Sequence, residues 1–398
     1  MNKTPAVRFK GFTEGWEQQK LEDISDVRDG THDSPVYQDE GHPFVTSKNV
    51  KNGYINFDGI QYISDYDFFE INKRSKVDIN DILMGMIGTI GNLALIRTEP
   101  NFAIKNVALI KDTKHVSYLY LYHYLKSSNI ERQLIFGMDG GTQKFVSLKK
   151  IRELKIKIPD DDEQIKLGTF MESLDNLIVF YQRKYEKLKN IKKSMLYKMF
   201  PQNGSKVPEI RFAGFTDEWE QRKLGKLAIF NPKAELPEIF EYVDLESVVG
   251  TEMISHRTES KITAPSRAQR LARTGDLFYQ TVRPYQKNNY LFEKPDKHYV
   301  FSTGYAQMRP LVDGQFLLSL VQNENFVKMV LDNCTGTSYP AINSNDLADI
   351  EVLSPTEKEE QRIIGSFFKG IGNLITLHQR KLEKLEQIKQ AMLHKMFV

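Results

Sequence analysis

The sequence predicts an α+β fold in which two mixed α/β domains are joined by two long helices packed as an antiparallel coiled coil, with a pseudo-two-fold internal duplication. Residues 163–200 return as residues 360–397, with about half of the aligned positions identical. Residues 5–21 return as residues 208–224 and place the chain's two tryptophans at equivalent positions. The copies lie roughly 200 residues apart, far beyond the ~20–50 residues of a solenoid repeat, so the pattern indicates a duplicated domain plus helix.

Each copy of the longer stretch is predicted to be one helix. No proline interrupts either run, and Pro201 closes the first. A helix of this length spans about 55 Å. Apolar residues at spacings of three and four are typical of a coiled-coil seam. Two matching seams favour mutual antiparallel packing, and a core helix in a large domain is the alternative. The seam residues, which are also the predicted partner-binding positions, are Phe170, Leu174, Leu177, Tyr181, Leu188, Ile191, Met195, Phe367, Leu374, Leu385, Ile388 and Met392.

The two halves share a frame that begins with the tryptophan motif. A third matched segment precedes each helix, because residues 140–159 align with residues 336–355. Residues 201–208 hold turn-forming residues without an apolar period and are predicted to be the linker. The predicted division is a first domain at 1–150, a first connector at 151–203, a second domain at 204–346 and a second connector at 347–398.

Between the repeated parts the halves diverge. Residues 22–139 and 225–335 show no alignment with each other, although both look like mixed domains with short strands and Gly/Asn/Asp turns. Strands are expected at 54–57, 82–84, 93–96, 276–280 and 290–292, and amphipathic helices at 115–127 and 316–331. A duplicated frame with divergent inserts suggests one scaffold that presents two different readers.

Composition narrows the class of protein. A chain of 398 residues with 40% hydrophobic content can bury two ordinary cores. The single cysteine, Cys334, excludes a disulfide framework and fits a reducing compartment. Eight scattered histidines offer no metal-ligand spacing, so no metal site is predicted. The amino terminus lacks the apolar core of a signal peptide, and residues 82–96 are too short and glycine-rich to span a membrane. A cytoplasmic location without membrane contact is expected.

Catalytic motifs are missing from the sequence. It has no GxxxxGK[ST] phosphate loop, no GxGxxG and no Asn-Pro-Pro-aromatic tetrapeptide. Glu153 and Lys155 form the E-x-K ending of many nucleases, but no convincing Pro-Asp precedes them. The acidic run 160–163 complements a helix dipole more simply than it binds a metal. The chain is therefore predicted to be non-catalytic by itself and to carry no cofactor.

The repeated motifs resemble those of a known family. The start pattern PxxRFxGFxxxWExxKL, the helices that open on Glu-Gln and end in KMF, and the two unlike domains are similar to the specificity subunit of Type I restriction–modification enzymes. The resemblance covers the whole chain and rests on the order and duplication of these motifs. It implies that each variable domain is a target recognition domain for one half of a split double-stranded DNA sequence.

The resemblance also implies partners. The helices would form a spacer that sets the gap and docks two modification (methyltransferase) subunits, and restriction (nuclease/translocase) subunits would join that core. S-adenosylmethionine, ATP and Mg²⁺ would serve those partner subunits. Half-sites read from one face of the duplex are expected about one turn, ~34 Å, apart, and the target is expected to be asymmetric because the domains differ.

Polar and basic residues in turn-like stretches are the candidate DNA contacts, because base edges are read by hydrogen bonds and phosphates are held by cations. The first domain supplies Thr31, His32, Asp33, Lys48, Asn49, Lys73, Arg74, Lys105, Asn106, Gln143 and Lys144. The second supplies Arg257, Lys261, Arg267, Arg270, Arg283, Tyr285, Lys287, Ser302, Thr303, Tyr305, Thr337, Ser338 and Tyr339. For each of these residues, an ordinary solvated loop position is the alternative.

Three other functions stay open at the level of sequence. The chain could be a coiled-coil scaffold that binds two protein partners without DNA. It could belong to a modification-only system, which the same framework would serve. A self-contained restriction–methylation enzyme is the third alternative, although such an enzyme needs a catalytic domain that the sequence does not show. Salt-dependent DNA affinity separates the first of these from a DNA reader.

Overall fold

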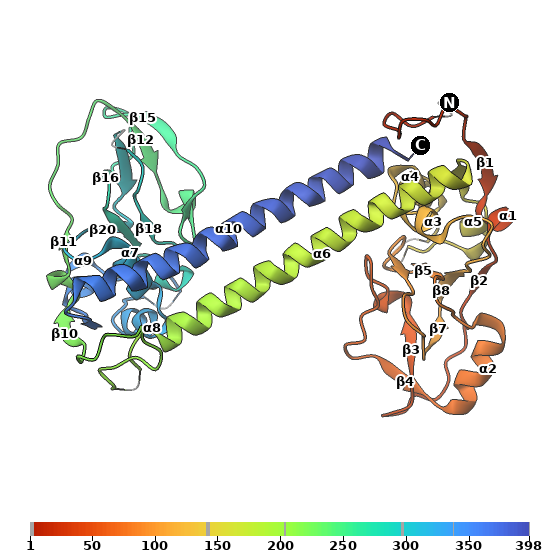
Figure 1. The fold of residues 1–398 in the computed structure, drawn as a ribbon, viewed down its shortest axis with the longest axis horizontal. Helices are drawn as coiled ribbons and strands as arrows, with labels where there is room; N and C mark the ends of the chain where they lie inside the picture. The colour runs from red at the N-terminus through yellow and green to blue at the C-terminus, as the bar shows by residue number, and fades with distance from the viewer. Residues whose placement is uncertain (1–3, 141–143, 203, 296–297, 337, 398) are drawn as a thin grey trace. The chain divides into compact units, whose positions relative to one another are not determined.

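The chain forms two compact units that share two long helices. The computed structural model describes residues 4–140, 144–202, 204–295, 298–336 and 338–397. Unit 1 comprises Met1–Tyr181 with Arg380–Val398, and unit 2 comprises Gln182–Gln379. Helix α6 (Asp161–Lys198) begins in unit 1 and ends in unit 2, whereas α10 (Lys358–Lys395) begins in unit 2 and ends in unit 1 (Figure 1). The prediction of two long, oppositely directed helices is confirmed.

Unit 1 is built on two small sheets. The four-stranded sheet has the order β2-β8-β5-β6, formed by Val27–Asp29, Val107–Ile110, Ile82–Gly85 and Leu93–Leu95. The three-stranded sheet has the order β4-β3-β7, formed by Gln61–Ile63, His42–Thr46 and Ala103–Lys105. A separate pair joins β1 (Glu17–Lys20) to β9 (Lys155–Ile158). The helices are α1 (Leu21–Ile24), η1 (Ser47–Asn49), α2 (Asp65–Ser75), α3 (Tyr118–Tyr124), α4 (Ser128–Gly137) and α5 (Leu148–Arg152). Helix α2 packs against β7 (Figure 1).

Unit 2 has the same kinds of parts. One sheet has the order β11-β20-β17-β18, formed by Ala228–Phe230, Tyr305–Pro310, Leu277–Gln280 and Tyr290–Leu291. The other has the order β15-β12-β19-β16, formed by Arg257–Ser260, Ile239–Val243, Tyr299–Ser302 and Ala268–Leu271. Two further pairs join β10 (Glu220–Lys223) to β21 (Glu351–Ser354) and β13 (Val248–Val249) to β14 (Glu252–Met253). The helices are η2 (Leu224–Lys226), η3 (Leu245–Ser247), η4 (Pro284–Gln286), α7 (Gly314–Gln322), α8 (Glu324–Asp332) and α9 (Ser344–Asp349).

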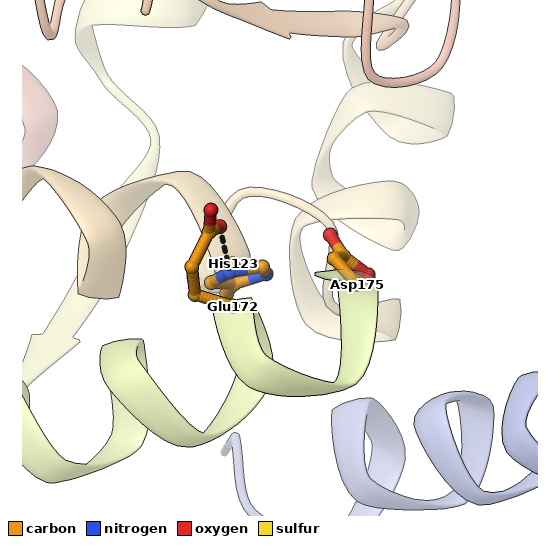
Figure 2. A group of neighbouring side chains, drawn as sticks. All are labelled: His123, Glu172 and Asp175. Carbon is orange, nitrogen blue, oxygen red and sulfur yellow. Dashed lines mark ion pairs between the residues drawn. The ribbon is translucent and has the colours of Figure 1, made fainter. Parts of the chain in front are cut away.

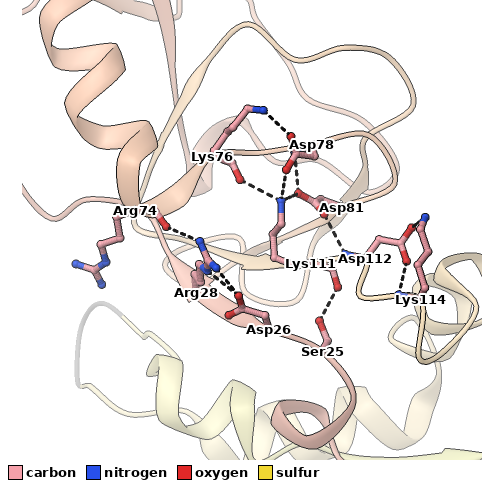
Figure 3. Close-up of polar contacts among 10 residues, drawn as sticks. All are labelled: Ser25, Asp26, Arg28, Arg74, Lys76, Asp78, Asp81, Lys111, Asp112 and Lys114. Carbon is pink, nitrogen blue, oxygen red and sulfur yellow. Dashed lines mark hydrogen bonds and ion pairs between the residues drawn. The ribbon is translucent and has the colours of Figure 1, made fainter.

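The units share a topology even where their sequences do not align. The order β2-β8-β5-β6 matches β11-β20-β17-β18 strand for strand, and each second sheet contains one parallel pair, β3–β7 or β12–β19. A buried ion pair ties the equivalent strands together in both units. In unit 1, Lys111 Nζ lies 2.6 Å from Asp81 and 2.6 Å from Asp78 (Figure 3). In unit 2, Arg309 Nε lies 2.9 Å from Asp276. The divergent inserts are therefore one duplicated domain.

Most of the predicted strands are confirmed, as β5, β6, β17 and β18. The strand predicted at 54–57 is wrong, because that segment makes only an isolated bridge between Val50 and Ile55. Gly53 precedes it with φ of +108°, and the Asn56 side chain accepts a hydrogen bond from the Asp58 N–H at 3.0 Å. The chain therefore turns here, as short asparagine side chains favour.

The helices of the inserts differ from prediction in extent. The helix expected at 115–127 is shorter, as α3, and α4 follows it. The single helix expected at 316–331 is wrong, because it is broken into α7 and α8 at Asn323. Asn323 has φ −66° and ψ 141°, which is extended, and its side chain accepts the Asn325 N–H. A capping asparagine in this conformation ends one helix and begins the next.

The first turn of helix α6 contains a buried glutamate, which is bound by side chains from the repeated segment at residues 5–21. Glu163 is 0% exposed and accepts two hydrogen bonds from the Arg8 guanidinium, both of 2.7 Å. The Trp16 indole N–H donates a third, of 3.1 Å. A buried carboxylate must be paired and hydrogen-bonded, and these contacts satisfy that requirement. The repeated arginine, tryptophan and glutamate therefore form one clamp.

Helix α10 begins with the same clamp. Glu360 is 1% exposed and accepts hydrogen bonds of 2.7 and 2.9 Å from Arg211 and of 3.3 Å from the Trp219 indole. The next residue is a buried glutamine in both helices, and Gln361 binds the Asp313 N–H at 3.3 Å as Gln164 binds the Ser117 N–H at 2.9 Å. These bonds fix the first turn of α6 to the start of α3, and the first turn of α10 to the start of α7.

The end of each long helix fills a core. Phe200 follows α6 and packs in unit 2 against Trp219, with ring centroids 5.7 Å apart. Phe397 follows α10 and packs in unit 1 against Tyr120, with centroids 5.8 Å apart. The repeated KMF endings are therefore core residues, and the core of unit 1 includes the end of the chain.

The predicted seam is mostly correct but shifts phase near its middle. Leu174 is buried, whereas Leu177 is 43% exposed and Leu374, its equivalent, is 46% exposed. Ile178 and Ile375 are half-buried instead. A straight helix drifts by about 20° per heptad from a 3.5-residue repeat, so a pattern read in steps of three and four selects the wrong neighbour here.

Within the described residues, no helix is both long enough and apolar enough to cross a membrane.

The contacts of Glu360 predict that its substitution destabilises the fold more than substitution of the neighbouring Glu359. Glu360→Gln should lower the free energy of unfolding of unit 2 by about 3 kcal/mol, because it leaves the Arg211 cation, whose side chain is only 11% exposed, without its partner. Calorimetric unfolding of the full chain measures this. The control is Glu359→Gln, because Glu359 pairs with Arg362 at the surface and should be dispensable. Equal effects of the two substitutions would contradict the clamp.

Candidate nucleic-acid interface

Three turns meet at one end of the four-stranded sheet in unit 1. The Ser47 hydroxyl donates to the carbonyl of Asn106, in the turn between β7 and β8, and accepts the Met86 N–H at 3.0 Å, in the turn after β5. Ile87, in that second turn, bridges to Phe145 in the closing loop before α5. One buried serine thus ties together segments that are far apart in the sequence.

A polar cluster stands at the first of these turns. His32 is exposed, and its ring nitrogens lie 2.8 Å from the Asp29 carboxylate and 2.7 Å from the Asn106 side-chain oxygen. Asp29 is 5% exposed and also pairs with Arg74, while Lys105 donates to Ser34. Asn106 has a φ of +52°, a left-handed conformation that asparagine tolerates. The structure therefore brings together His32, Arg74, Lys105 and Asn106, which the sequence left separate.

Two more predicted residues line the same surface. Thr31 bridges to Lys105, and its hydroxyl accepts the Asp33 N–H at 3.1 Å. Thr31, Asp33 and Arg74 line a shallow cavity of about 350 Å³. Lys73 lies nearby on α2, is exposed and pairs with Glu70. Asp29, which orients both His32 and Arg74, was missed by the sequence analysis because a single acidic residue at a strand end carries no motif.

The remaining predicted residues of unit 1 are placed differently. Asn49 is 5% exposed, and its amide is used within the chain, bonding to Thr46 and to the carbonyl of Asn56. Its predicted role as a DNA contact does not fit this burial. Lys48 and Lys144 are exposed, and Gln143 lies outside the described residues.

Unit 2 has three turns at the equivalent end of its sheet. Thr281, after β17, donates both its N–H (3.0 Å) and its hydroxyl (2.8 Å) to the carbonyl of Gly304, in the turn between β19 and β20. The Arg283 N–H donates to the carbonyl of Pro340 at 2.8 Å, and Val282 bridges to Ala341, in the closing loop before α9. These are the positions that the Asn106, Ile87 and Phe145 turns occupy in unit 1.

A cation and an aromatic ring meet at this surface. The Arg283 guanidinium lies 4.4 Å from the centroid of the Tyr339 ring, and Tyr339 is 64% exposed. Tyr285 is 49% exposed in the same turn. Arg283 and Lys287 have φ of +54° and +56°, which bends the turn around η4. Lys287 also pairs with Glu324 at 2.6 Å. Arg283 itself is half-buried, and a guanidinium stacked on an exposed ring suits a phosphate or a base.

Two predicted residues beside this turn are core residues. Ser302 is 2% exposed, with its hydroxyl accepting the Gly304 N–H, and Tyr305 is 0% exposed, with its hydroxyl 3.3 Å from the Asp244 carbonyl. Their predicted DNA contacts do not fit this burial. Thr303 lies between them and is half-buried, and its N–H donates to the carbonyl of Arg267 at 2.7 Å.

The other predicted residues of unit 2 differ in where they lie and in how exposed they are. Arg257 and Lys261 lie on or after edge strand β15 and pair with acidic residues, Arg257 with Asp244 at 2.7 Å. Arg270, on β16, is half-buried, and burial lowers its pKa. Arg267 and Ser338 are exposed, and Thr337 lies outside the described residues.

The fold is that of specificity (S) subunits of type I restriction–modification systems. It matches the crystal structure of a Type-I restriction-modification system S subunit from M. genitalium with a TM-score of 0.67 and 14% sequence identity, over 99% of both chains. A second match, from work on complex assembly and conformational transition of the type I R-M system, has a TM-score of 0.52 and 18% identity, over 96% of this chain and 97% of the other.

Sequence comparison identifies the family. The model of the Type I restriction modification DNA specificity domain matches residues 13–190 and 251–387. The chain belongs to this family, which confirms the resemblance. It is 24% identical to the Type I restriction enzyme MjaVIII specificity subunit of Methanocaldococcus jannaschii, over 88% of this chain and 87% of that protein.

A buried ionic cluster lies elsewhere in unit 1, among α3, α6 and the end of α10. His123, Glu172 and Asp175 lie together, with ligand atoms within 4.8 Å of one another (Figure 2). Cations already occupy their surroundings. Arg97 pairs with Glu172 at 2.9 Å, Lys389 with Asp175, and Lys126 lies 3.9 Å from Asp175. Three cations beside two carboxylates leave no excess negative charge for a metal ion, so this is an ionic network.

Burial and contacts within the network shift the pKa values of its residues. Contact with His123 and then with the Arg97 guanidinium lowers the pKa of Glu172 to about 2. Burial lowers the pKa of Lys126 to about 8. Burial also lowers the pKa of His123, whose Nε2 lies 3.8 Å from Glu172. The imidazole is therefore neutral at pH 7.

The buried histidine predicts a loss of stability in acid. When the pKa of an imidazole is lower in the folded chain than in the unfolded chain, the stability of the folded chain is highest above the ordinary pKa of about 6.5. That stability falls as the pH drops below this value, because the unfolded chain then binds a proton that the folded chain does not. Unfolding free energy should begin to fall as the pH drops through about 6.5, and the slope from this residue is at most about 1.4 kcal/mol per pH unit.

His123→Gln should remove that part of the slope, whereas substitution of the exposed His115 should leave it unchanged. An unaltered slope in His123→Gln would show that the histidine is not held neutral.

Proposed function

We propose that this chain is the non-catalytic DNA-reading subunit of a Type I restriction–modification complex, in which each unit reads one half of an asymmetric, bipartite target. The observation that carries this proposal is the placement of the candidate residues. Some of them, Asn106 in unit 1 and Arg283 and Tyr339 in unit 2, lie on or beside three adjacent turns at the same end of equivalent sheets. One scaffold thus presents two surfaces of the same layout.

The side chains on those surfaces differ between the units. Unit 1 presents His32, Arg74 and Asn106, which are joined through Asp29. Unit 2 presents Arg283 stacked on Tyr339. An amide and a guanidinium make different hydrogen bonds in the major groove, asparagine suiting adenine and arginine suiting guanine or phosphate. Different half-sites follow from different side chains on one scaffold, and the target is therefore not a palindrome.

We propose recognition domains at residues 1–150 and 204–346, with connectors at 151–203 and 347–398. In this proposal α6 and α10 set the gap and dock two modification subunits, to which restriction subunits bind. Leu177 and Leu374, which are exposed on the connectors, are the first candidates for that contact. S-adenosylmethionine, ATP and Mg²⁺ belong to those partner subunits in this scheme, and this chain carries no cofactor.

The first experiment maps adenine methylation across a genome with the chain expressed beside its modification subunit, against a strain that lacks the chain. A split, asymmetric methylated motif should appear only when the chain is present. Replacing residues 22–139 by the corresponding segment of a relative should change one half-site and leave the other half-site unchanged. A change in both halves would contradict separate reading, and a chain that supports no motif with a bound modification subunit would favour a protein scaffold.

A second experiment tests the unit 2 surface. Arg283→Gln should weaken binding to the cognate duplex about tenfold and reduce the slope of log affinity against log salt by about one, because one cation leaves the phosphates. The control is Arg222→Gln, since Arg222 is exposed on β10 and pairs with Glu220 away from the turns. Binding that Arg283→Gln leaves unaltered would rule this turn out as a DNA contact.

A further inference from the structure

Every position of the ionic network in unit 1 has an equivalent in unit 2. The long helices align without gaps, which pairs Lys389 with Lys192, Asp175 with Gly372 and Glu172 with Lys369. The helices α3 and α7 are matched through Ser117 and Asp313, which cap them and receive equivalent glutamines. The strand register of β5–β6 and β17–β18 completes the match. These alignments pair Arg97 with Glu293, His123 with Ser319 and Lys126 with Gln322.

One ion pair of the network is kept with its charges reversed. In unit 1 the strand side supplies Arg97 and the helix supplies Glu172, at 2.9 Å. In unit 2 the strand side supplies Glu293 and the helix supplies Lys369, at 2.6 Å. The reversal preserves the contact, which shows that the two sites occupy the same place in the fold.

Of the ion pair between Lys389 and Asp175, only the lysine has a charged equivalent in unit 2. Lys389 pairs with Asp175 in unit 1, but its equivalent Lys192 faces Gly372. A Cβ placed on Gly372 would lie 3.9 Å from Lys192 Nζ, and no other atom lies within 4 Å of it apart from its own helix backbone. Within the described part of the chain Lys192 makes no hydrogen bond or ion pair. Burial lowers the pKa of Lys192, and no carboxylate acts against that shift.

A cavity takes the place of the missing side chains. It has a volume of about 170 Å³ and is lined by Lys192 and Gly372 together with residues of α7 and of the β13–β14 hairpin. Of its two nearby carboxylates, Glu293 is paired with Lys369, whereas Glu252 accepts a hydrogen bond from the Thr376 hydroxyl and keeps its charge. Neither forms an ion pair with Lys192 in the described residues. The lining also includes Leu196, Leu318 and Phe368, so the space offers a half-buried cation beside apolar walls.

We propose that this cavity is a binding site for a small aliphatic carboxylate, whose anionic group occupies the place that Asp175 holds in unit 1 and pairs with Lys192. The chemistry follows from the vacancy. A half-buried ammonium without a partner favours an anion, and the equivalent pair of Lys389 with Asp175 shows that a carboxylate fits. The apolar walls contact a short hydrocarbon body. The volume allows a few carbon atoms beyond the carboxylate and excludes a macromolecular ligand.

The test is a methyl NMR titration of the full chain with its lysines converted to ¹³C-dimethyl-lysine, which remains a cation. The Lys192 signal is assigned by its loss in Lys192→Met. Acetate should shift that signal saturably and raise the pKa of Lys192, whereas chloride at the same ionic strength should do neither. Propionate should bind about fourfold more tightly than acetate, because one more methylene enters the apolar part of the cavity.

Two substitutions of the glycine separate an ionic effect from a helical one. Gly372→Asp should raise the pKa of Lys192 without ligand and abolish the acetate response, since the carboxylate is then internal. Gly372→Ala is the matched control. It also removes the helical glycine and adds a Cβ, leaves the ammonium unpaired and should retain the acetate response. In the reciprocal variant, Asp175→Gly, the Lys389 signal should acquire a response to acetate.

Failure is as clearly defined. An unchanged Lys192 signal at saturating acetate and propionate, in a chain where Gly372→Asp does raise the pKa of Lys192, would overturn the proposal. A response to chloride equal to that to acetate would also overturn it, because the site would then lack selectivity for carboxylates.

Discussion

A buried negative charge at the start of each long helix is the constraint on which the rest of the frame depends. Glu163 and Glu360 are almost fully enclosed, and an enclosed carboxylate is tolerated only when cations and donors surround it. The arginine and tryptophan that satisfy each carboxylate come from the segment that precedes the first strand of the unit, about 150 residues away along the chain. Closing this contact brings the beginning and the end of each domain together. It also fixes where the helix starts, and therefore how its side chains face the core.

Each long helix begins in one unit and ends in the other. Each unit receives the Met-Phe ending of the helix that started in the other unit, so Phe200 completes the core around Trp219 and Phe397 completes the core around Tyr120. The core of unit 1 thus combines Trp16 with Met396 and Phe397, which are far apart in the sequence. Because the same three contacts recur in both units, the strands between them can change sequence without changing topology.

The sequence alone was sufficient for the frame, because the residues of the clamp and of the helix ends recur by identity. It did not show that the inserts are the same domain. The contacts that prove it are conserved as pairs rather than as residues. Lys111 beside Asp81 is replaced by Arg309 beside Asp276. The pair Arg97–Glu172 returns with its charges reversed as Glu293–Lys369, which an alignment by identity does not register. Burial was the other hidden quantity. Asn49 and Tyr305 belong to polar, turn-like stretches, yet tertiary contacts enclose them, whereas His32 and Arg283 remain at the surface.

The pattern of divergence follows from how many partners each residue has. Glu163 has Arg8 and Trp16 as simultaneous partners, so a change at any one of the three leaves a buried polar group unsatisfied, and the clamp recurs unaltered. Residues of the three turns at the end of each four-stranded sheet are joined largely through backbone groups, as Thr281 is to Gly304, and their side chains are free to differ. The ionic network lies between these extremes, because its pairs can reverse together. Where only one member changed, as at Gly372, the remaining cation was left facing a cavity. At these positions the two units therefore differ where a side chain is free at the surface, where a pair reverses together, or where a cavity takes the place of a side chain.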